Sequence, residues 1–303
     1  MTPVTQRKLT RFSLFSGLLA IMLIFMIWPI ALTVSGGFQT PEGVFTLKYI
    51  YDFSATPEQP GIGVLQDPQL RQGLINALMI AVCTTVLCMI ITIPLAVVGT
   101  NYNFIGKGIV TNLILIPLIL PPFVGAIGLR FLMGRFGAFN SGLAEAGVLD
   151  PNAPGIDFLG GAAGGRFLGV VIMEALHLYP ILYLNVSAAL ANLDPALEEA
   201  AIGLGASRWK RFFKVTFPLI LPGIFAGSTI VFIWSFTELG TPLMFEYYTV
   251  TPVQIFFGIK EVADNPRPYA LVVVMLTVAV GLYLIGRFSF GGKGHAMYSK
   301  ASR

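Results

Sequence analysis

Charged residues are scarce in this sequence: Lys, Arg, Asp and Glu together make up only 11% of its 303 residues, while hydrophobic residues make up 55%. That balance excludes a soluble globular protein and favours a chain that crosses a membrane several times. Cysteine is scarcer still, with two in the chain. Cys83 and Cys88 would lie on different faces of one helix, so we expect neither a disulfide nor a metal pair.

Long apolar runs are abundant by contrast. A helix needs about 20 apolar residues to cross a bilayer, and six runs satisfy this, so we predict an all-α membrane protein with six transmembrane helices. The first run is too long for the apolar region of a signal peptide and no small-residue cleavage site follows it, so we expect it to persist as a helix. The six runs are residues 12–34, 74–99, 109–132, 167–190, 219–239 and 269–288.

The distribution of charge across the loops predicts the orientation. With six spans both termini share one side, whose segments hold twelve basic and three acidic residues, a balance of +9. The opposite loops hold six basic and ten acidic residues, a balance of −4, and Arg130, Glu174 and Glu238 lie within or beside spans. Basic loops stay in the cytoplasm, so we place both termini there. The net charge of +4 thus reflects topology, and we predict no nucleic-acid binding.

One polar, basic segment stands between two apolar runs, residues 199–218, reading EAAIGLGASRWKRFFKVTFP. We expect a helix to begin near Asp194-Pro195 and Gly205 to permit a sharp turn into a second helix. The small side chains of Ala200 and Ala201 would let another protein approach closely. Four aromatic residues after the turn share one helix face, and three basic residues lie away from it. The four are Trp209, Phe212, Phe213 and Phe217, and the three are Arg208, Arg211 and Lys214.

The spacing of this segment resembles the EAA signature of permease subunits of binding-protein-dependent ABC importers. Further passages with the same character are Pro94-Leu95-Ala96, the run IPLILPPFVGA at 116–126 and NLDPALEEAA at 192–201, so the resemblance covers roughly residues 70–288. Val215 and Phe217 stand where isoleucine and leucine are commonest. The sequences IGLGASRW at 202–209 and WSFTELGTPLMF at 234–245 are more similar to the iron, polyamine and phosphonate permeases of this family than to its sugar permeases.

The resemblance implies a type I ABC importer permease bundle in a bacterial inner membrane. It implies as partners two cytoplasmic ABC ATPase subunits, a second permease and a periplasmic or lipid-anchored solute-binding protein. The ATPase-coupling residues would be Glu199, Ala200, Ala201, Gly205, Ala206, Ser207 and Pro218. In this scheme Glu199 would pair with an ATPase arginine or cap its own helix.

No nucleotide site is expected in this chain. Gly106-Lys107 is not followed by Ser or Thr, so the phosphate-binding pattern GxxxxGK[ST] fails. ATP and Mg would therefore be bound by the partner ATPase, the chain itself would be no enzyme, and we predict no cofactor or metal in it. We divide it into residues 1–34 (N-terminus and first helix), 35–73 (periplasmic loop), 70–290 (permease domain, with a coupling loop at 193–218) and 289–303 (cytoplasmic tail).

Ionisable residues at membrane depth are costly and often functional. Glu174 and His177 are three residues apart in the fourth span, where they could bond to each other and line a cavity. Glu238 stands just before Gly240-Thr241-Pro242, where the fifth helix must break. We interpret Glu174, His177, Glu238 and Thr241 as candidates for the translocation path or its gate. The alternative is that Glu174 and His177 form a satisfied interhelical pair and Glu238 lies at the wet interface.

Two other classes of function remain as alternatives. A lone intramembrane acid could carry a proton in a transporter driven by an ion gradient, without ATP. A membrane enzyme built on Glu174-x-x-His177 would need a second such motif and two more inward carboxylates, which the spans do not contain. The sequence does not name the solute or say whether the partner permease is identical.

Overall fold

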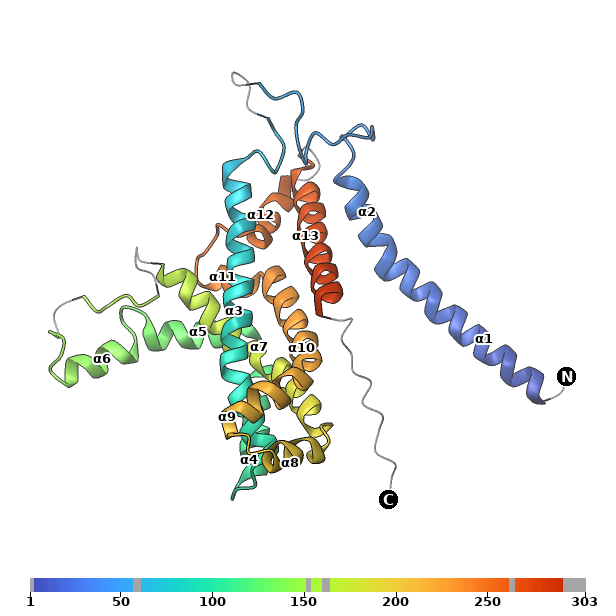
Figure 1. The fold of residues 1–303 in the computed structure, drawn as a ribbon. Helices are drawn as coiled ribbons and strands as arrows, with labels where there is room; N and C mark the ends of the chain where they lie inside the picture. Colours follow the sequence, from blue (N-terminus) through green and yellow to red (C-terminus); the bar gives the residue numbers. More distant parts are fainter. Residues whose placement is uncertain (1–2, 57–60, 151–153, 160–163, 262–264, 291–303) are drawn as a thin grey trace. The chain divides into compact units, whose positions relative to one another are not determined.

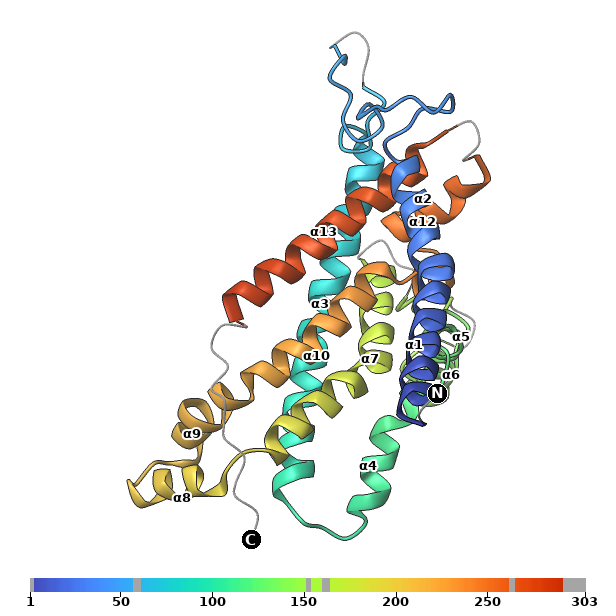
Figure 2. The ribbon, with the colours of Figure 1, turned by 90° about the vertical axis from the view of Figure 1, so that its right-hand side faces the viewer.

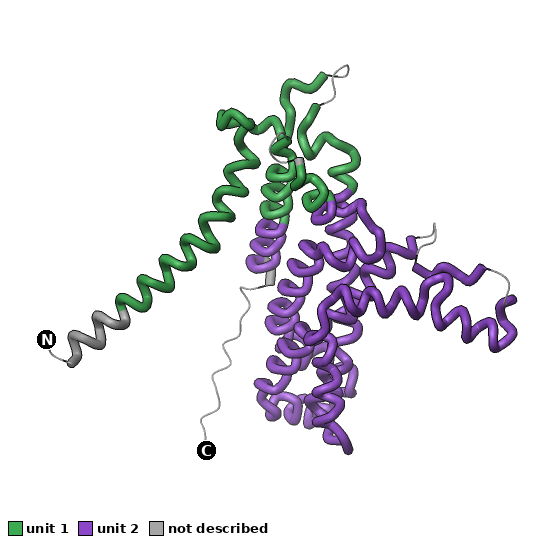
Figure 3. The backbone as a smooth tube through the Cα atoms, turned by 180° about the vertical axis from the view of Figure 1, so that it is seen from behind, with its two compact units in different colours: residues 1–72, 254–278 green, residues 73–253, 279–303 purple. Residues whose placement is uncertain are grey.

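The computed structural model describes residues 3–56, 61–150, 154–159, 164–261 and 265–290, with side chains from residue 12 to residue 288. These residues are almost entirely helical, apart from turns and one isolated bridge between Gln39 and Phe45. The chain forms two compact units, residues 1–72 with 254–278 and residues 73–253 with 279–303 (Figure 3). The predicted division at residues 34, 73 and 289 stays a prediction, and residues 291–303 of the predicted tail lie outside the described ranges.

The first unit begins with one long apolar helix. It comprises α1 (Pro3–Met22), a π-helical turn η1 (Leu23–Ile27) and α2 (Trp28–Gly36). Residues 12–36 are long and apolar enough to span a membrane, and no side chain in their most apolar window is buried within the chain. The predicted first span, 12–34, is confirmed, and the observed span ends two residues later. Its surface is left for lipid or for other protein chains.

The loop after α2 is organised around Asp52. Its carboxylate accepts hydrogen bonds from Ser54 Oγ (2.5 Å) and N (3.0 Å) and from the amide of Ile62 (3.3 Å). The Ser54 hydroxyl is the largest cause of a lowered pKa at Asp52. Gln66 adds a pair of bonds with the Asp52 backbone, at 2.7 and 3.1 Å. These bonds join the described residues on the two sides of the segment 57–60.

The second unit is built on three long helices. They are α3 (Pro68–Asn101), of which residues 73–101 belong to this unit, α7 (Gly165–Ala191) and α10 (Phe217–Thr237). α7 and α10 lie side by side (Figures 1 and 2). A Cβ on Gly223 would come within 2.6 Å of Ala189 Cβ, and one on Gly227 within 2.7 Å of Leu182 Cδ1. Glycine therefore lets these two helices approach closely, as small residues do in membrane bundles.

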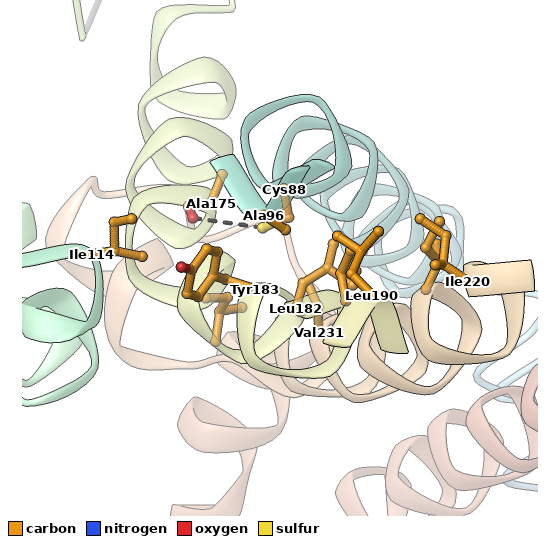
Figure 4. Close-up of a cluster of buried hydrophobic side chains, with 12 residues drawn as sticks. Cys88, Ala96, Ile114, Ala175, Leu182, Tyr183, Leu190, Ile220 and Val231 are labelled. Atoms are coloured by element: carbon orange, nitrogen blue, oxygen red, sulfur yellow. Dashed lines mark hydrogen bonds between the residues drawn. The ribbon is translucent and has the colours of Figure 1, made fainter. Parts of the chain in front are cut away.

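The core of this unit lies where the three helices meet (Figure 4). Leu182, Val186, Ile220 and Val231 are completely buried there. Cys88 is buried in the same cluster with its thiol 3.5 Å from the carbonyl of Ala175. Both cysteines are free in the structure.

The third predicted span, 109–132, is broken rather than continuous. The structure divides it into α4 (Lys107–Leu115), the 3-10 turn η2 (Ile116–Leu118) and α5 (Pro122–Met133), followed by α6 (Ala138–Glu145). The chain bends by 98° between residues 118 and 122. Pro117, Pro121 and Pro122 lack the N–H groups that a continuous helix would need there. Figure 1 shows α5 and α6 pointing away from α3 after this bend.

The other elements complete both units. The short helices are α8 (Pro195–Gly203), α9 (Arg208–Arg211), η3 (Phe212–Thr216), α11 (Gly240–Met244), α12 (Thr251–Gly258) and η4 (Ile259–Glu261), and the last helix is α13 (Arg267–Phe290). Five helices in the described residues can span a membrane, and a sixth is obtained when the bent segment counts as one span. The predicted all-α class and six spans are confirmed, with one span broken.

Candidate functional site

A helical hairpin stands at one end of the second unit, where the basic segment of the sequence predicted it. Asp194 caps α8 through a hydrogen bond that its side chain accepts from the amide of Ala196 (3.1 Å). Gly205 then adopts φ +74°, a left-handed conformation in which glycine is favoured. Ser207 caps α9, since its Oγ accepts from Lys210 N at 3.4 Å. Asp194, rather than Glu199, therefore caps the first helix.

The outer surface of this hairpin is apolar and exposed. Leu204 is 88% exposed and Trp209 is 72% exposed. Glu199, Ala200 and Gly205 are exposed beside them, Ala201 and Ala206 are half-buried, and Pro218 is exposed near the start of α10. A Cβ on Gly205 would meet no atom of the described residues within 4 Å, so none of them occupies the space over the turn. Such a surface suits a protein partner.

The aromatic side chains after the turn gather as predicted. The rings of Trp209 and Phe213 stack with their centroids 6.0 Å apart, and Phe212 and Phe213 meet edge to face at 5.1 Å. Phe217 contacts both phenylalanines at 6.1 and 6.4 Å. The hairpin therefore has its own small aromatic cluster, which stiffens α9 and η3 against the start of α10.

Sequence reasoning missed Glu198, the neighbour of the glutamate in the signature. Its Oε1 accepts a hydrogen bond from Thr216 Oγ1 at 2.8 Å, and its Oε2 lies 3.8 Å from Arg211 Nε. Glu198 thus ties α8 to η3, while Glu199 points away from them and stays exposed. The only sequence signal was that two successive glutamates on a helix lie about 100° apart, so that one can face inward when the other faces outward.

A second site lies inside the helical core, around Glu174. This carboxylate is only 2% exposed. Its Oε2 accepts hydrogen bonds from Ser235 Oγ on α10 and from Thr84 Oγ1 on α3, the latter at 3.4 Å. Oε1 has no hydrogen-bond partner among the described residues. Glu174 therefore joins three helices through hydroxyl groups.

The expected hydrogen bond between Glu174 and His177 is wrong. His177 Nδ1 instead lies 2.9 Å from the carbonyl oxygen of Pro117 in η2. The physical reason is the proline four residues later: Pro121 has no N–H to donate to this carbonyl, as a helix would require. With its proton on Nδ1, the imidazole supplies the missing donor. His177 thereby fastens α7 to the break in the third span.

Glu238 ends α10 and begins the next turn. Its Oε1 accepts from the amides of Gly240 (3.0 Å) and Thr241 (3.3 Å), so it caps α11. Glu174, His177, Glu238 and the buried Thr241 line one narrow space together with Trp234, and this space leaves no room for a water molecule. The structure thus brings the four candidate path or gate residues together in a closed arrangement. Their role in transport stays a prediction.

Neither site holds a metal-ligand cluster: the described residues contain no group of three or more His, Cys, Asp or Glu side chains suited to a metal ion. The hairpin offers a surface for another protein. The closed group around Glu174 offers a constriction between helices.

Comparison with known proteins adds family information to this geometry. Residues 89–290 match the family described as "Binding-protein-dependent transport system inner membrane component". The molybdenum transport system permease protein ModB of Haemophilus influenzae is 33% identical over 175 residues, which cover 56% of this chain and 71% of that protein. ModB of Mycobacterium tuberculosis is 30% identical over 221 residues, 71% of this chain and 78% of that protein.

Other similar proteins are more distant. A putative ferric transport system permease, FbpB 1 of Haemophilus influenzae, is 25% identical over 86% of this chain and 40% of its own length. Among solved structures, a chain of a bacterial ABC transporter that imports the polysaccharide alginate superposes with a TM-score of 0.73 at 18% identity, covering 95% of this chain and 97% of that one. At 18% identity this similarity shows a shared fold and no more.

Proposed function

The chain belongs to the family of inner-membrane components of binding-protein-dependent transport systems, and from this premise we propose that it imports a tetrahedral oxyanion of the molybdate or tungstate type. It is a multi-pass permease subunit of an ATP-driven importer, which works with ATPase subunits, a second permease and a solute-binding protein. ATP is hydrolysed on a separate subunit, so the chain is no enzyme. This family membership decides against an ion-gradient transporter.

The substrate class rests on the curated relatives. Those at 33% and 30% identity are named for molybdenum transport, and one from Thermococcus kodakarensis, at 27%, is named for molybdate and tungstate. The ferric relative is 25% identical. The iron, polyamine or phosphonate preference inferred from two short passages therefore receives less support than molybdate or tungstate.

The coupling proposal rests on one observation, the exposed hairpin from α8 to α9. Leu204 and Trp209 together present apolar surface that no other described part of the chain covers. We assign this surface, with Glu199, Ala200, Ala201, Gly205, Ala206, Ser207 and Pro218, to contact with the ATPase that binds ATP and Mg. The charge balance of +9 against −4 supports a cytoplasmic position for the hairpin and both termini.

The transport pathway is assigned to the closed group around Glu174. His177, Glu238 and Thr241 lie there with a buried carboxylate, between helices that hydrogen bonds join. We propose that this group is the closed state of a gate. ATP-driven rearrangement of the two permeases would open it, since a ligand or nucleotide shifts a population between two packed states.

Reconstitution tests the proposed function. The permease is purified with its ATPase and inserted into vesicles, and uptake of radiolabelled molybdate is measured with binding protein and ATP. We expect uptake that needs both additions and that tungstate suppresses more than sulfate does. Uptake of ferric citrate or a polyamine in place of molybdate, with the same ATP requirement, would overturn the substrate class and leave the importer assignment intact.

A further inference from the structure

Three arginines from separate parts of the second unit converge on one pocket. Arg130 comes from α5, Arg135 from the turn after α5 and Arg166 from the first turn of α7. The pocket has a volume of about 260 Å³, and Asp157 and Glu246 supply its acidic groups. We call it the arginine pocket. The predicted topology places it on the outer side, where a binding protein would deliver its solute.

Glu246 occupies the arginine pocket as an internal counter-ion. Its Oε1 lies 3.1 Å from Arg130 Nη2, and its Oε2 lies 3.6 Å from Arg166 Nη2. The arginines are held in place independently of that carboxylate. Arg130 Nη1 donates to the carbonyl of Met244 at 2.7 Å, and Arg166 Nη1 donates to the backbone carbonyl of Glu246 at 3.2 Å.

The carboxylate of Glu246 is replaceable. The three paired side chains are 44–48% exposed, and ion pairs in contact with water contribute only about 0–1 kcal/mol each. Glu246 also has φ +55°, the one positive φ of a non-glycine residue in the described ranges. A side chain on such a backbone is disfavoured relative to glycine. An anion that binds both guanidinium groups can therefore displace it at small cost.

Arg135 provides a further donor group. The structure gives its side chain no hydrogen bond or ion pair with another described residue. The backbone beside it is held in place, because the buried Asn140 bonds to the backbone on both sides of the pocket. Asn140 Nδ2 donates to the carbonyls of Gly134 (3.0 Å) and Ile156 (2.8 Å), and its Oδ1 accepts from Ile156 N (2.9 Å). Arg135 and Asp157 directly follow the two clamped residues.

The charge of the pocket indicates which kind of ligand it can bind. With Glu246 displaced, three arginines and Asp157 leave a charge of +2, which balances a divalent anion. The volume is below the roughly 300–1,000 Å³ typical of sites for drug-sized ligands, so a small ion with a few waters fits. Arginine guanidinium groups recognise oxyanions by paired, charge-assisted hydrogen bonds.

We propose that the arginine pocket is a binding site for a tetrahedral oxyanion, which exchanges with the Glu246 carboxylate. This inference rests on the proposed function, because it takes the solute to be an oxyanion. The site lies close to the gate along the chain: α11 joins Glu238 and Thr241 at its start to Glu246 just after its end. The arginine pocket and the gate residues are therefore separated by one short helix.

Direct binding tests the site. The complex of permease and ATPase, without binding protein, is placed in lipid nanodiscs and titrated with radiolabelled molybdate at low salt. Arg135→Gln should weaken binding roughly tenfold, as expected for one lost charged hydrogen bond. Glu246→Gln should strengthen it several-fold, because the competing charge is gone. Arg71→Gln, which removes an exposed arginine elsewhere on the predicted outer side, should change nothing.

The outcomes separate this inference from the proposed function. Wild-type molybdate uptake with equal affinity in all variants would overturn the pocket and leave the importer intact. Weaker docking of the binding protein to Arg135→Gln, with unchanged molybdate affinity, would overturn it too and make the arginines a docking surface. If the importer carries a cation, the wild-type protein will take up no molybdate. The proposed function then fails before any variant is compared.

Discussion

Thr216 donates a hydrogen bond through Oγ1 to Glu198 Oε1 across 2.8 Å, although the two residues are eighteen positions apart. Thr216 is 3% exposed, so this bond lies in the base of the hairpin. It connects α8 to the last residue of η3, directly before α10, the helix that contributes Ser235 to the bonds of Glu174. The hairpin is therefore joined to the base of the core helix by a short, defined contact.

Thr216→Val removes this donor and keeps the shape of the side chain. We expect the permease to fold, because Glu198 is half-exposed and water can solvate its free carboxylate. Stimulation of the ATPase by the loaded binding protein should fall several-fold, since the hairpin is less firmly joined to α10. The measurement is ATP hydrolysis in vesicles with and without binding protein.

Thr229→Val serves as the matched control, since the Thr229 hydroxyl bonds only to Phe225 O in its own helix, at 2.8 Å. It should leave stimulation at the wild-type level. Equal stimulation in both variants would show that the bond between Thr216 and Glu198 takes no part in coupling.

The Gly205→Asn variant should fold normally but should no longer couple to the ATPase. At φ +74° alanine costs about 1 kcal/mol, whereas asparagine adopts left-handed conformations more readily. Within the part of the chain that the structure describes, no atom lies within 4 Å of the added Cβ. We therefore expect Gly205→Asn to reach normal levels in the membrane while the ATPase no longer co-purifies with it. Gly108, where an added Cβ also meets no described atom within 4 Å, provides the control, and Gly108→Asn should still co-purify with the ATPase. Co-purification of the ATPase with both variants would show that the hairpin does not contact it.

Much of the hairpin could be predicted from the sequence, because its signals are local. Asp194 and Pro195 mark a helix start, and Gly205 marks a left-handed turn. The core site could not be predicted to the same depth. Glu174 and His177 were recognised as unusual at membrane depth, but their partners, Ser235 and Pro117, are distant in sequence and depend on how the helices pack. Prolines 117, 121 and 122 are local signals for a kinked helix, while the 98° bend also depends on which helix meets the freed carbonyl.

His177 should be replaceable by asparagine and not by leucine. The Nδ2 of asparagine can take the place of the imidazole Nδ1 and donate to Pro117 O, at 2.9 Å in the structure. Leucine leaves that carbonyl without its donor, which costs about 1–3 kcal/mol where water is absent. Thermal unfolding of the purified complex should show a lower midpoint for His177→Leu than for His177→Asn. The same loss in both variants would mean that the ring itself is needed, for instance against Trp234 at 6.3 Å.

The predicted orientation can be tested with single cysteines. In a background where Cys83 and Cys88 are alanine, Glu42→Cys and Val148→Cys should react with a membrane-impermeant maleimide in intact cells without their outer barrier. Ile105→Cys, whose native side chain is fully exposed, should react only after lysis. The reverse labelling would invert the topology, because the charge balance of +9 against −4 predicts the side of each loop.

Glu238 offers the sharpest separation of a gate from a solute ligand. Its Oε1 caps α11 through the amides of Gly240 and Thr241, at 3.0 and 3.3 Å. Glutamine keeps that oxygen and loses only the charge, so Glu238→Gln should retain most uptake and a low basal ATPase rate. Glu238→Ala removes the cap, which is worth about 1 kcal/mol, and frees α11 to move. We expect it to hydrolyse ATP without binding protein, several-fold faster than wild type. Loss of uptake in Glu238→Gln with a normal basal rate would instead mean that the carboxylate meets a cation, and that result would contradict both the gate and the oxyanion.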